Sequence, residues 1–155
     1  MQRVFEKAPS LELYERLRKL AGAAARDRAI EFLKAQLPRE APTRWHSPSD
    51  LLISILMHEK MQDAAWAIVR DHGASMGLKM TLARACEATH PSKTLETYVE
   101  RVEELANTGG DHAYAEAAQL VARLAGLQSA TEHSTYVAAL KARFARRRNF
   151  MKLLS

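Results

Sequence analysis

The most informative part of the sequence is residues 91–127, PSKTLETYVERVEELANTGGDHAYAEAAQLVARLAGL. In the first half, apolar side chains recur every three or four positions and share one face of a helix: Leu95, Tyr98, Val99, Val102 and Leu105. The second half repeats this pattern with Tyr114, Ala117, Ala118, Val121, Leu124 and Ala125. Between them, Gly109 can take the left-handed conformation that ends a helix, and Asp111 can cap the next one. The segment predicts a helical hairpin that needs helical neighbours.

The same periodicity runs through the rest of the chain and predicts about eight helices. Their approximate ranges are 11–21, 26–37, 48–57, 62–72, 76–89, 91–108, 111–125 and 130–154. Ser10 and the run 129–132 predict N-terminal caps, and Ser47 with Pro48 predicts another helix start. Gly22 marks a helix end. Arg147 falls within the apolar arc of the last helix, so that helix either bends there or lets Arg147 reach along the surface to water.

Short turns between the predicted helices favour antiparallel pairs, namely the third with the fourth, the fifth with the sixth and the seventh with the eighth. Trp66, Tyr98 and Tyr136 are spaced by 32 and 38 residues, a drifting repeat. This favours an all-α fold, an α-solenoid of stacked antiparallel helical hairpins like tetratricopeptide repeats. A globular α-bundle would show the same stripes. We expect one domain over residues 1–155, with a candidate internal boundary at the Pro-rich stretch 38–48.

Composition indicates a folded, soluble chain. The 155 residues are 47% apolar and 26% charged, which excludes wholesale disorder. No apolar run approaches the roughly 20 residues that a membrane span needs, and the first ten residues lack the apolar region of a secretory signal. The single cysteine, Cys86, suits a reducing compartment. We therefore expect a cytoplasmic protein without membrane contact.

The net charge of +5 is concentrated at the end of the chain. No acid follows Glu132, whereas the last fifteen residues hold Lys141, Arg143, Arg146, Arg147, Arg148 and Lys152. These six cations are the candidate contact for nucleic acid or another anion. No aromatic residues interleave with them as a stacking platform, so a solvated cationic helix end that complements the helix dipole is the competing interpretation.

No reactive constellation emerges from the other polar residues. The histidines, none of which has another one helical turn away, are His46, His58, His72, His90, His112 and His133. Cys86 falls on an apolar stripe and is interpreted as a core thiol rather than a nucleophile. The acidic residues 96–104 form a ridge that either faces water or attracts the basic last helix, and a paired-carboxylate site there would need a cleft. We expect no catalytic residue, metal or cofactor.

Four segments resemble one family in the same order: LLISILMHEKMQDAAWAIVRDHG, LARACEATHPSKTLETYVERV, DHAYAEAAQLVARL and YVAALKARFARRRNFMKLLS. They are similar to a helical domain of unknown function that follows SWIM-type zinc fingers in bacterial proteins. The resemblance covers residues 51–155 well and the first fifty loosely. It implies an all-helical repeat region for protein or nucleic-acid interaction. The zinc finger itself needs a Cys-x-Cys pair, a further Cys and a His, and only Cys86 is present.

Together these observations predict a non-catalytic helical-repeat module that binds another protein through a groove or face of the stack. In such a stack the third, fifth and seventh predicted helices would line the groove. The alternative is a nucleic-acid-binding accessory module that uses the basic C-terminal helix beside a zinc finger elsewhere in a longer protein. An enzyme is the third and least favoured class. The oligomeric state is open between a monomer and a weak homodimer.

Overall fold

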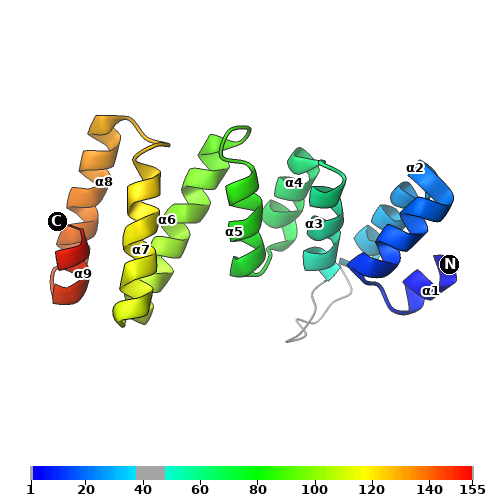
Figure 1. Ribbon diagram of the computed structural model, residues 1–155, viewed down its shortest axis with the longest axis horizontal. Coiled ribbons are helices and arrows are strands. Elements are labelled where there is room, and N and C mark those ends of the chain that lie inside the picture. The colour runs from blue at the N-terminus through cyan, green and yellow to red at the C-terminus, as the bar shows by residue number, and fades with distance from the viewer. Residues whose placement is uncertain (1, 38–47, 155) are drawn as a thin grey trace. The chain divides into compact units, whose positions relative to one another are not determined.

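The computed structural model describes residues 2–37 and 48–154, and within these ranges every regular element is an α-helix (Figure 1). The helices are α1 (Gln2–Lys7), α2 (Leu11–Gln36), α3 (Pro48–His58), α4 (Gln62–His72), α5 (Met76–Ala85), α6 (Pro91–Thr108), α7 (Asp111–Leu124), α8 (Ala130–Arg143) and α9 (Arg148–Leu153). Neighbouring helices pack in pairs, so the predicted all-α fold class is confirmed. Ser47 and the rest of the stretch 38–47 lie outside the described residues.

The chain divides into two compact units, residues 1–79 and 80–155, and the division falls within α5. The prediction of a single domain with a boundary at 38–48 is not tested by the described residues. In the first unit α1 packs on α2, α2 on α3, and α3 on α4. The short helix α1 has no counterpart among the predicted helices. It is held by Phe5, which is fully buried with its ring 6.5 Å from Tyr14 and 6.2 Å from Phe32.

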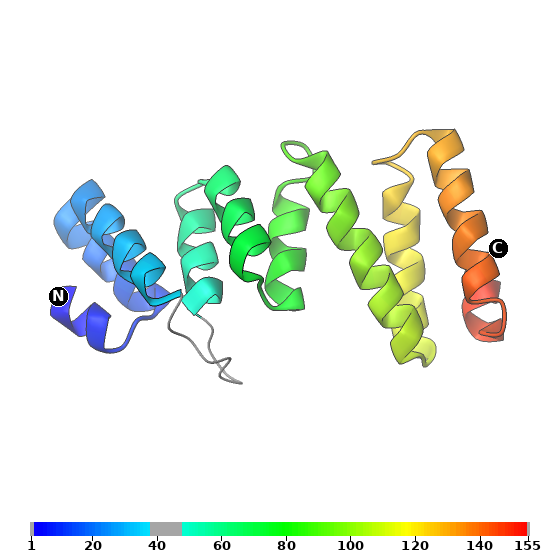
Figure 2. The ribbon, with the colours of Figure 1, turned by 180° about the vertical axis from the view of Figure 1, so that it is seen from behind.

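A reversal at Gly22 turns α2 into two arms, which correspond to the first two predicted helices. Gly22 has φ 67° and ψ −150°, a combination that only glycine populates readily. Figures 1 and 2 show the arms side by side and running in opposite directions. The predicted cap at Ser10 is confirmed, because its hydroxyl accepts a hydrogen bond from the Leu13 N–H at 3.2 Å.

We expect Gly22→Ala to destabilise the first unit by about 1–3 kcal/mol. Nothing lies within 4 Å of a Cβ placed at Gly22, so the loss would come from backbone strain alone. Gly77→Ala is the matched control, since Gly77 also has open space but lies in α5 without a positive φ. Chemical denaturation followed by tryptophan fluorescence suits both variants, because the chain's two tryptophans precede residue 80. Equal stability of the two variants would contradict the assigned reversal.

In the second unit the most extensive packing joins α6 to α7, and α7 also packs on α9. The fully buried residues of these three helices include Tyr98, Val102, Ala106, Ala117, Leu124 and Phe150. The hairpin predicted from residues 91–127 is therefore the centre of this unit. An ion pair adds to this packing, because Arg101 of α6 lies 3.2 Å from Glu116 of α7.

The turn between α6 and α7 differs in detail from the prediction. Gly109 has the expected positive φ of 79°, but its ψ of 174° lies outside the left-handed helical region. Gly110 rather than Asp111 is the N-cap of α7, and it offers no side chain. Asp111 is instead the first helical residue, so its predicted capping role was wrong. The backbone of Gly109 lies close to the Tyr114 side chain, because a Cβ at Gly109 would be 3.3 Å from the Tyr114 hydroxyl oxygen.

The predicted last helix is broken into α8 and α9 near Arg147, which settles the choice between a bend and a continuous helix. The helix begins as predicted, with a capping box in which the Ser129 hydroxyl accepts from the Glu132 N–H and the Glu132 carboxylate accepts from the Ser129 N–H. Helix α8 ends at Arg143, and the break after it allows both Phe144 and Phe150 to be buried in the core. The predicted fifth helix also ends early, at Ala85 rather than Thr89.

Candidate interaction surface

Helix α8 leaves most of its residues uncovered. Of its 14 residues, only Leu140 is buried, whereas α7, also of 14 residues, buries six. Tyr136 and Val137, the large apolar side chains near the middle of α8, are both half-buried. Because α8 is far less covered than α7, it presents the clearest unpartnered face of the second unit.

A groove of about 800 Å³ runs along this face between α7 and α8. From α7 and its C-cap residue the groove is lined at one or two helical turns' spacing by Ala118, Val121, Ala122 and Ala125. From α8 the lining follows the same spacing, with Ala130, His133, Ser134, Val137, Ala138 and Lys141. Leu153 and Leu154 from the end of α9 complete it. The walls are mostly apolar and small, which suits close packing of another helix rather than chemistry on a polar substrate.

The groove was not located by the sequence pattern. The predicted apolar face of the last helix, with Tyr136, Val137, Leu140 and Phe144, includes only Val137 of the residues that line the groove. The available signal was the small-residue run from Ala130 to Ala138 at helical spacing. Of the helices predicted to line a binding groove, only the seventh, α7, contributes to this one.

The six predicted cations have different environments. Lys141 is half-buried and lines the groove. Arg143 donates a hydrogen bond to the Glu103 carboxylate of α6 and lies 5.3 Å from the centre of the Phe144 ring. Its charge is therefore partly committed within the fold, and the acidic ridge of α6 does attract the basic helix at this point.

The remaining cations lie on the turn into α9 and on α9 itself. Arg146 and Arg147 line a second hollow of about 350 Å³ with Asn107, while Arg148 and Lys152 are exposed. Within residues 2–37 and 48–154, these four side chains and Lys141 make no hydrogen bond or ion pair. Their positive charge is thus available to a partner.

The structure does not assemble the other candidate residues into a reactive centre. Cys86 is fully buried, which confirms its interpretation as a core thiol. No group of three or more His, Cys, Asp or Glu side chains in the described part of the chain is placed to hold a metal ion. His46 lies outside that part. None of the described helices combines the length and apolar character of a membrane span.

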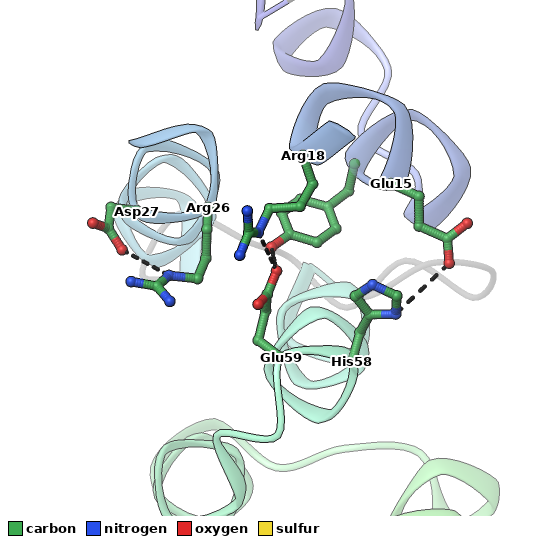
Figure 3. Close-up of polar contacts among 7 residues, drawn as sticks. Glu15, Arg18, Arg26, Asp27, His58 and Glu59 are labelled. Carbon is green, nitrogen blue, oxygen red and sulfur yellow. Dashed lines mark hydrogen bonds and ion pairs between the residues drawn. The ribbon is translucent and has the colours of Figure 1, made fainter. Parts of the chain in front are cut away.

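A cluster of charged and hydrogen-bonded side chains lies in the first unit and joins α2 to Glu59, the residue after α3. The Glu59 carboxylate accepts hydrogen bonds from the Tyr14 hydroxyl and, at 2.8 Å, from Arg18 Nε. Figure 3 shows Arg18 and Glu59 directed at one another, with His58 and Glu15 forming a longer contact of 3.8 Å beside them. The paired Arg26 and Asp27 lie on the other arm of α2.

A second cluster of the same composition occurs in the other unit. Glu87 accepts hydrogen bonds at 2.5 Å from both the Tyr98 hydroxyl and Arg123 Nε. Burial and the Glu87 carboxylate raise the pKa of Tyr98 to about 12. Each tyrosine hydroxyl donates a hydrogen bond to a carboxylate, and each carboxylate also pairs with an arginine. We therefore interpret both clusters as contacts that stabilise helix packing rather than as catalytic groups.

The two carboxylates make the stability of the protein sensitive to acid. Burial raises the pKa of Glu59, but the hydrogen bonds from Tyr14 and Arg18 outweigh it and leave the pKa below the usual 4.5. The Arg123 and Tyr98 hydrogen bonds likewise lower the pKa of Glu87. A lowered pKa in the folded state means that the unfolded chain binds protons first as the pH falls. This stabilisation is present above about pH 4.5 and is lost as the pH falls through the folded-state values.

We therefore expect the free energy of unfolding to fall below pH 4.5 more steeply for the wild type than for the double variant Glu59→Gln, Glu87→Gln. The double variant should be less stable at pH 7, and its stability should approach that of the wild type near pH 3. Urea denaturation at a series of pH values from 7 to 3 measures both effects. Parallel profiles would show that neither carboxylate is stabilised by folding.

The chain was compared with protein families, curated proteins and solved structures. No protein family, curated protein or solved structure matches the chain. The resemblance to the helical domain that follows SWIM-type zinc fingers therefore remains a prediction from the quoted segments.

Proposed function

We propose that this chain is a non-catalytic helical-repeat module that binds another protein through the groove between α7 and α8. The observation that carries the proposal is the poor coverage of α8, which leaves an apolar groove open to solvent. Burying an apolar face against a partner is favourable and needs no reactive group. The stacking of the helical hairpins into a tetratricopeptide-like solenoid belongs to the same proposal.

Two neighbouring alanines of α8 offer a matched test. Ala138 and Ala139 are both exposed, but only Ala138 lines the groove. We expect immobilised wild-type chain and Ala139→Gln to retain the same protein from a cell lysate. Ala138→Gln should retain roughly tenfold less of it, because a polar amide would be buried in an apolar contact. Quantitative mass spectrometry of the bound fractions measures this ratio. Equal retention by the two variants would contradict the proposed use of the groove.

The unpaired cations favour a second candidate, a nucleic-acid-binding accessory module. Arg146, Arg147 and Arg148 are exposed and lack acidic partners among the described residues. Three to five phosphate contacts would make the affinity for duplex DNA fall roughly 40- to 500-fold between 50 and 200 mM salt. Fluorescence anisotropy with a labelled duplex measures this dependence. Absence of binding at 50 mM salt would remove the candidate.

A further inference from the structure

We propose that the partner segment seated in the α7–α8 groove is an acidic amphipathic helix. This inference rests on the proposed function and adds the chemistry of the partner. It depends on three properties of the second unit, which are the length of the groove, the size of its side chains and the charge at one end.

The groove has the dimensions of a site for a short helix. On α8 its lining extends from Ala130 to Lys141, a distance of about 16 Å at 1.5 Å per residue. A partner helix of about twelve residues, or a little over three turns, would match this length. Such a helix would place apolar anchors at positions i, i+4, i+7 and i+11 along the groove.

The side chains of the groove favour a helix over an extended peptide. Alanine supplies several positions on both walls, including Ala118, Ala122 and Ala138. Because these side chains are small, the axis of a partner helix can approach the axes of α7 and α8 to about 8 Å. The exposed backbone needed to pair with an extended strand is absent here, since the α7 and α8 peptide groups are engaged within their helices.

The charge of the groove specifies acidic residues on the partner. Lys141 lies within the lining, in the last turn of α8, and the unpaired Arg148 and Lys152 lie on α9, the helix whose Leu153 completes the lining. The nearest acid on α8 is Glu132 at the opposite end, where its carboxylate is engaged in the capping box. Carboxylates beside the apolar stripe of a partner helix would be attracted to these cations. The attraction would also fix the direction in which the partner helix lies in the groove.

The same features disfavour the other occupants. Nucleic acid would gain no stacking, because Phe144 and Phe150 are buried, and its phosphates would lie over an apolar floor. A second copy of the chain could offer the acidic ridge of α6, but Glu103 and Glu104 are already paired with arginines of their own chain. An acidic helix from a different protein satisfies both the apolar and the charged part of the site.

Two synthetic peptides test the inference on the full chain. Both are 15-residue amphipathic helices with leucine at the four anchor positions, and one carries glutamate where the other carries lysine. We expect the glutamate peptide to bind at least about tenfold more tightly than the lysine peptide. On ¹⁵N-labelled protein, it should shift amide resonances of residues 118–125 and 130–141. Isothermal titration calorimetry gives the affinities.

Three variants assign the contact to the groove. Lys141→Glu should lower the affinity for the glutamate peptide by roughly tenfold and raise the affinity for the lysine peptide, because the charge at this position of the groove is reversed. Ala138→Glu should abolish binding of the glutamate peptide, whereas Ala139→Glu, at the adjacent exposed position, should stay within about twofold of the wild type. Circular dichroism of each variant confirms that the helices are intact.

Several results would overturn the inference. The two peptides could bind with equal affinity, or the amide shifts could be confined to residues outside the groove. A DNA duplex could bind more tightly than the glutamate peptide and displace it. The free chain could sediment as a dimer, with Ala138→Glu weakening the dimer. If the lysate partner still depends on Ala138 while the glutamate peptide fails, the acidic chemistry is wrong and the proposed function stands. If lysate retention does not depend on Ala138, the proposed function itself fails.

Discussion

Phe150→Ala is expected to destabilise the second unit by about 3–5 kcal/mol, although Phe150 lies only five residues from the end of the sequence. The ring is fully buried. It stacks on Tyr114 of α7 with ring centres 5.3 Å apart and an angle of 13° between the ring planes. It also meets Phe144 edge to face at 6.0 Å. Removing it would leave a cavity and release α9 from α7, because Phe150 is the only buried side chain of α9.

Urea denaturation followed by far-ultraviolet circular dichroism measures this loss, because the second unit contains no tryptophan. Leu153→Ala is the control on the same helix. Leu153 is 49% exposed, so its truncation should change the free energy of unfolding much less. If the two variants had equal stability, α9 would not be anchored by Phe150, and the end wall of the groove would be wrongly placed.

Tyr98 is the second position where a large loss is expected, and two variants separate its contributions. The side chain is fully buried on α6, and its hydroxyl donates to Glu87. Tyr98→Ala removes the ring and should cost about 3–5 kcal/mol. Tyr98→Phe keeps the ring but leaves the carboxylate with one donor fewer, and should cost about 1–3 kcal/mol. Both variants are compared with the wild type by urea denaturation at pH 7.

The acid dependence of the variants distinguishes the hydrogen bond from packing. Loss of the Tyr98 hydroxyl removes one of the two hydrogen bonds that lower the pKa of Glu87. The difference in stability between Tyr98→Phe and the wild type should therefore narrow as the pH falls below 4.5 and Glu87 becomes protonated. A difference that stays constant from pH 7 to pH 3 would mean that the hydroxyl does not stabilise the carboxylate.

Local signals in the sequence predicted the helices well where one residue controls the backbone. Gly22 and Gly109 both have positive φ, and Ser10 and Ser129 both cap helices as expected. Prediction was incomplete where tertiary packing decides between local alternatives. The apolar pattern continues from α8 into α9, and Arg147 within its arc left both a bend and a continuous helix open. The helix breaks there, and Phe144 and Phe150 on either side of the break are both buried, which periodicity alone does not predict. Helix α1 was missed because six residues are too few for a periodic signal.

The candidate surface was only partly predictable for a similar reason. Charge depends on composition alone, so the cationic end of the chain was evident from Lys141 to Lys152. The groove depends on which of two faces of α8 is covered by α7, and alanine contributes weakly to an apolar pattern. The charge pattern left an attraction between the acidic ridge and the basic last helix open, but the pairing of Arg143 with Glu103 joins residues 40 positions apart, and no local pattern selects that particular pair.

Backbone hydrogen exchange of the free chain is the most direct measurement of whether α8 has an open face. Amides of α6 and α7 should exchange slowly, since these helices bury six residues each. Amides of residues 130–139 should exchange at least roughly tenfold faster, because no side chain in that part of α8 is fully buried. Exchange from α8 as slow as from α7, in the absence of any partner, would mean that this face is already covered and that the groove is not free to bind.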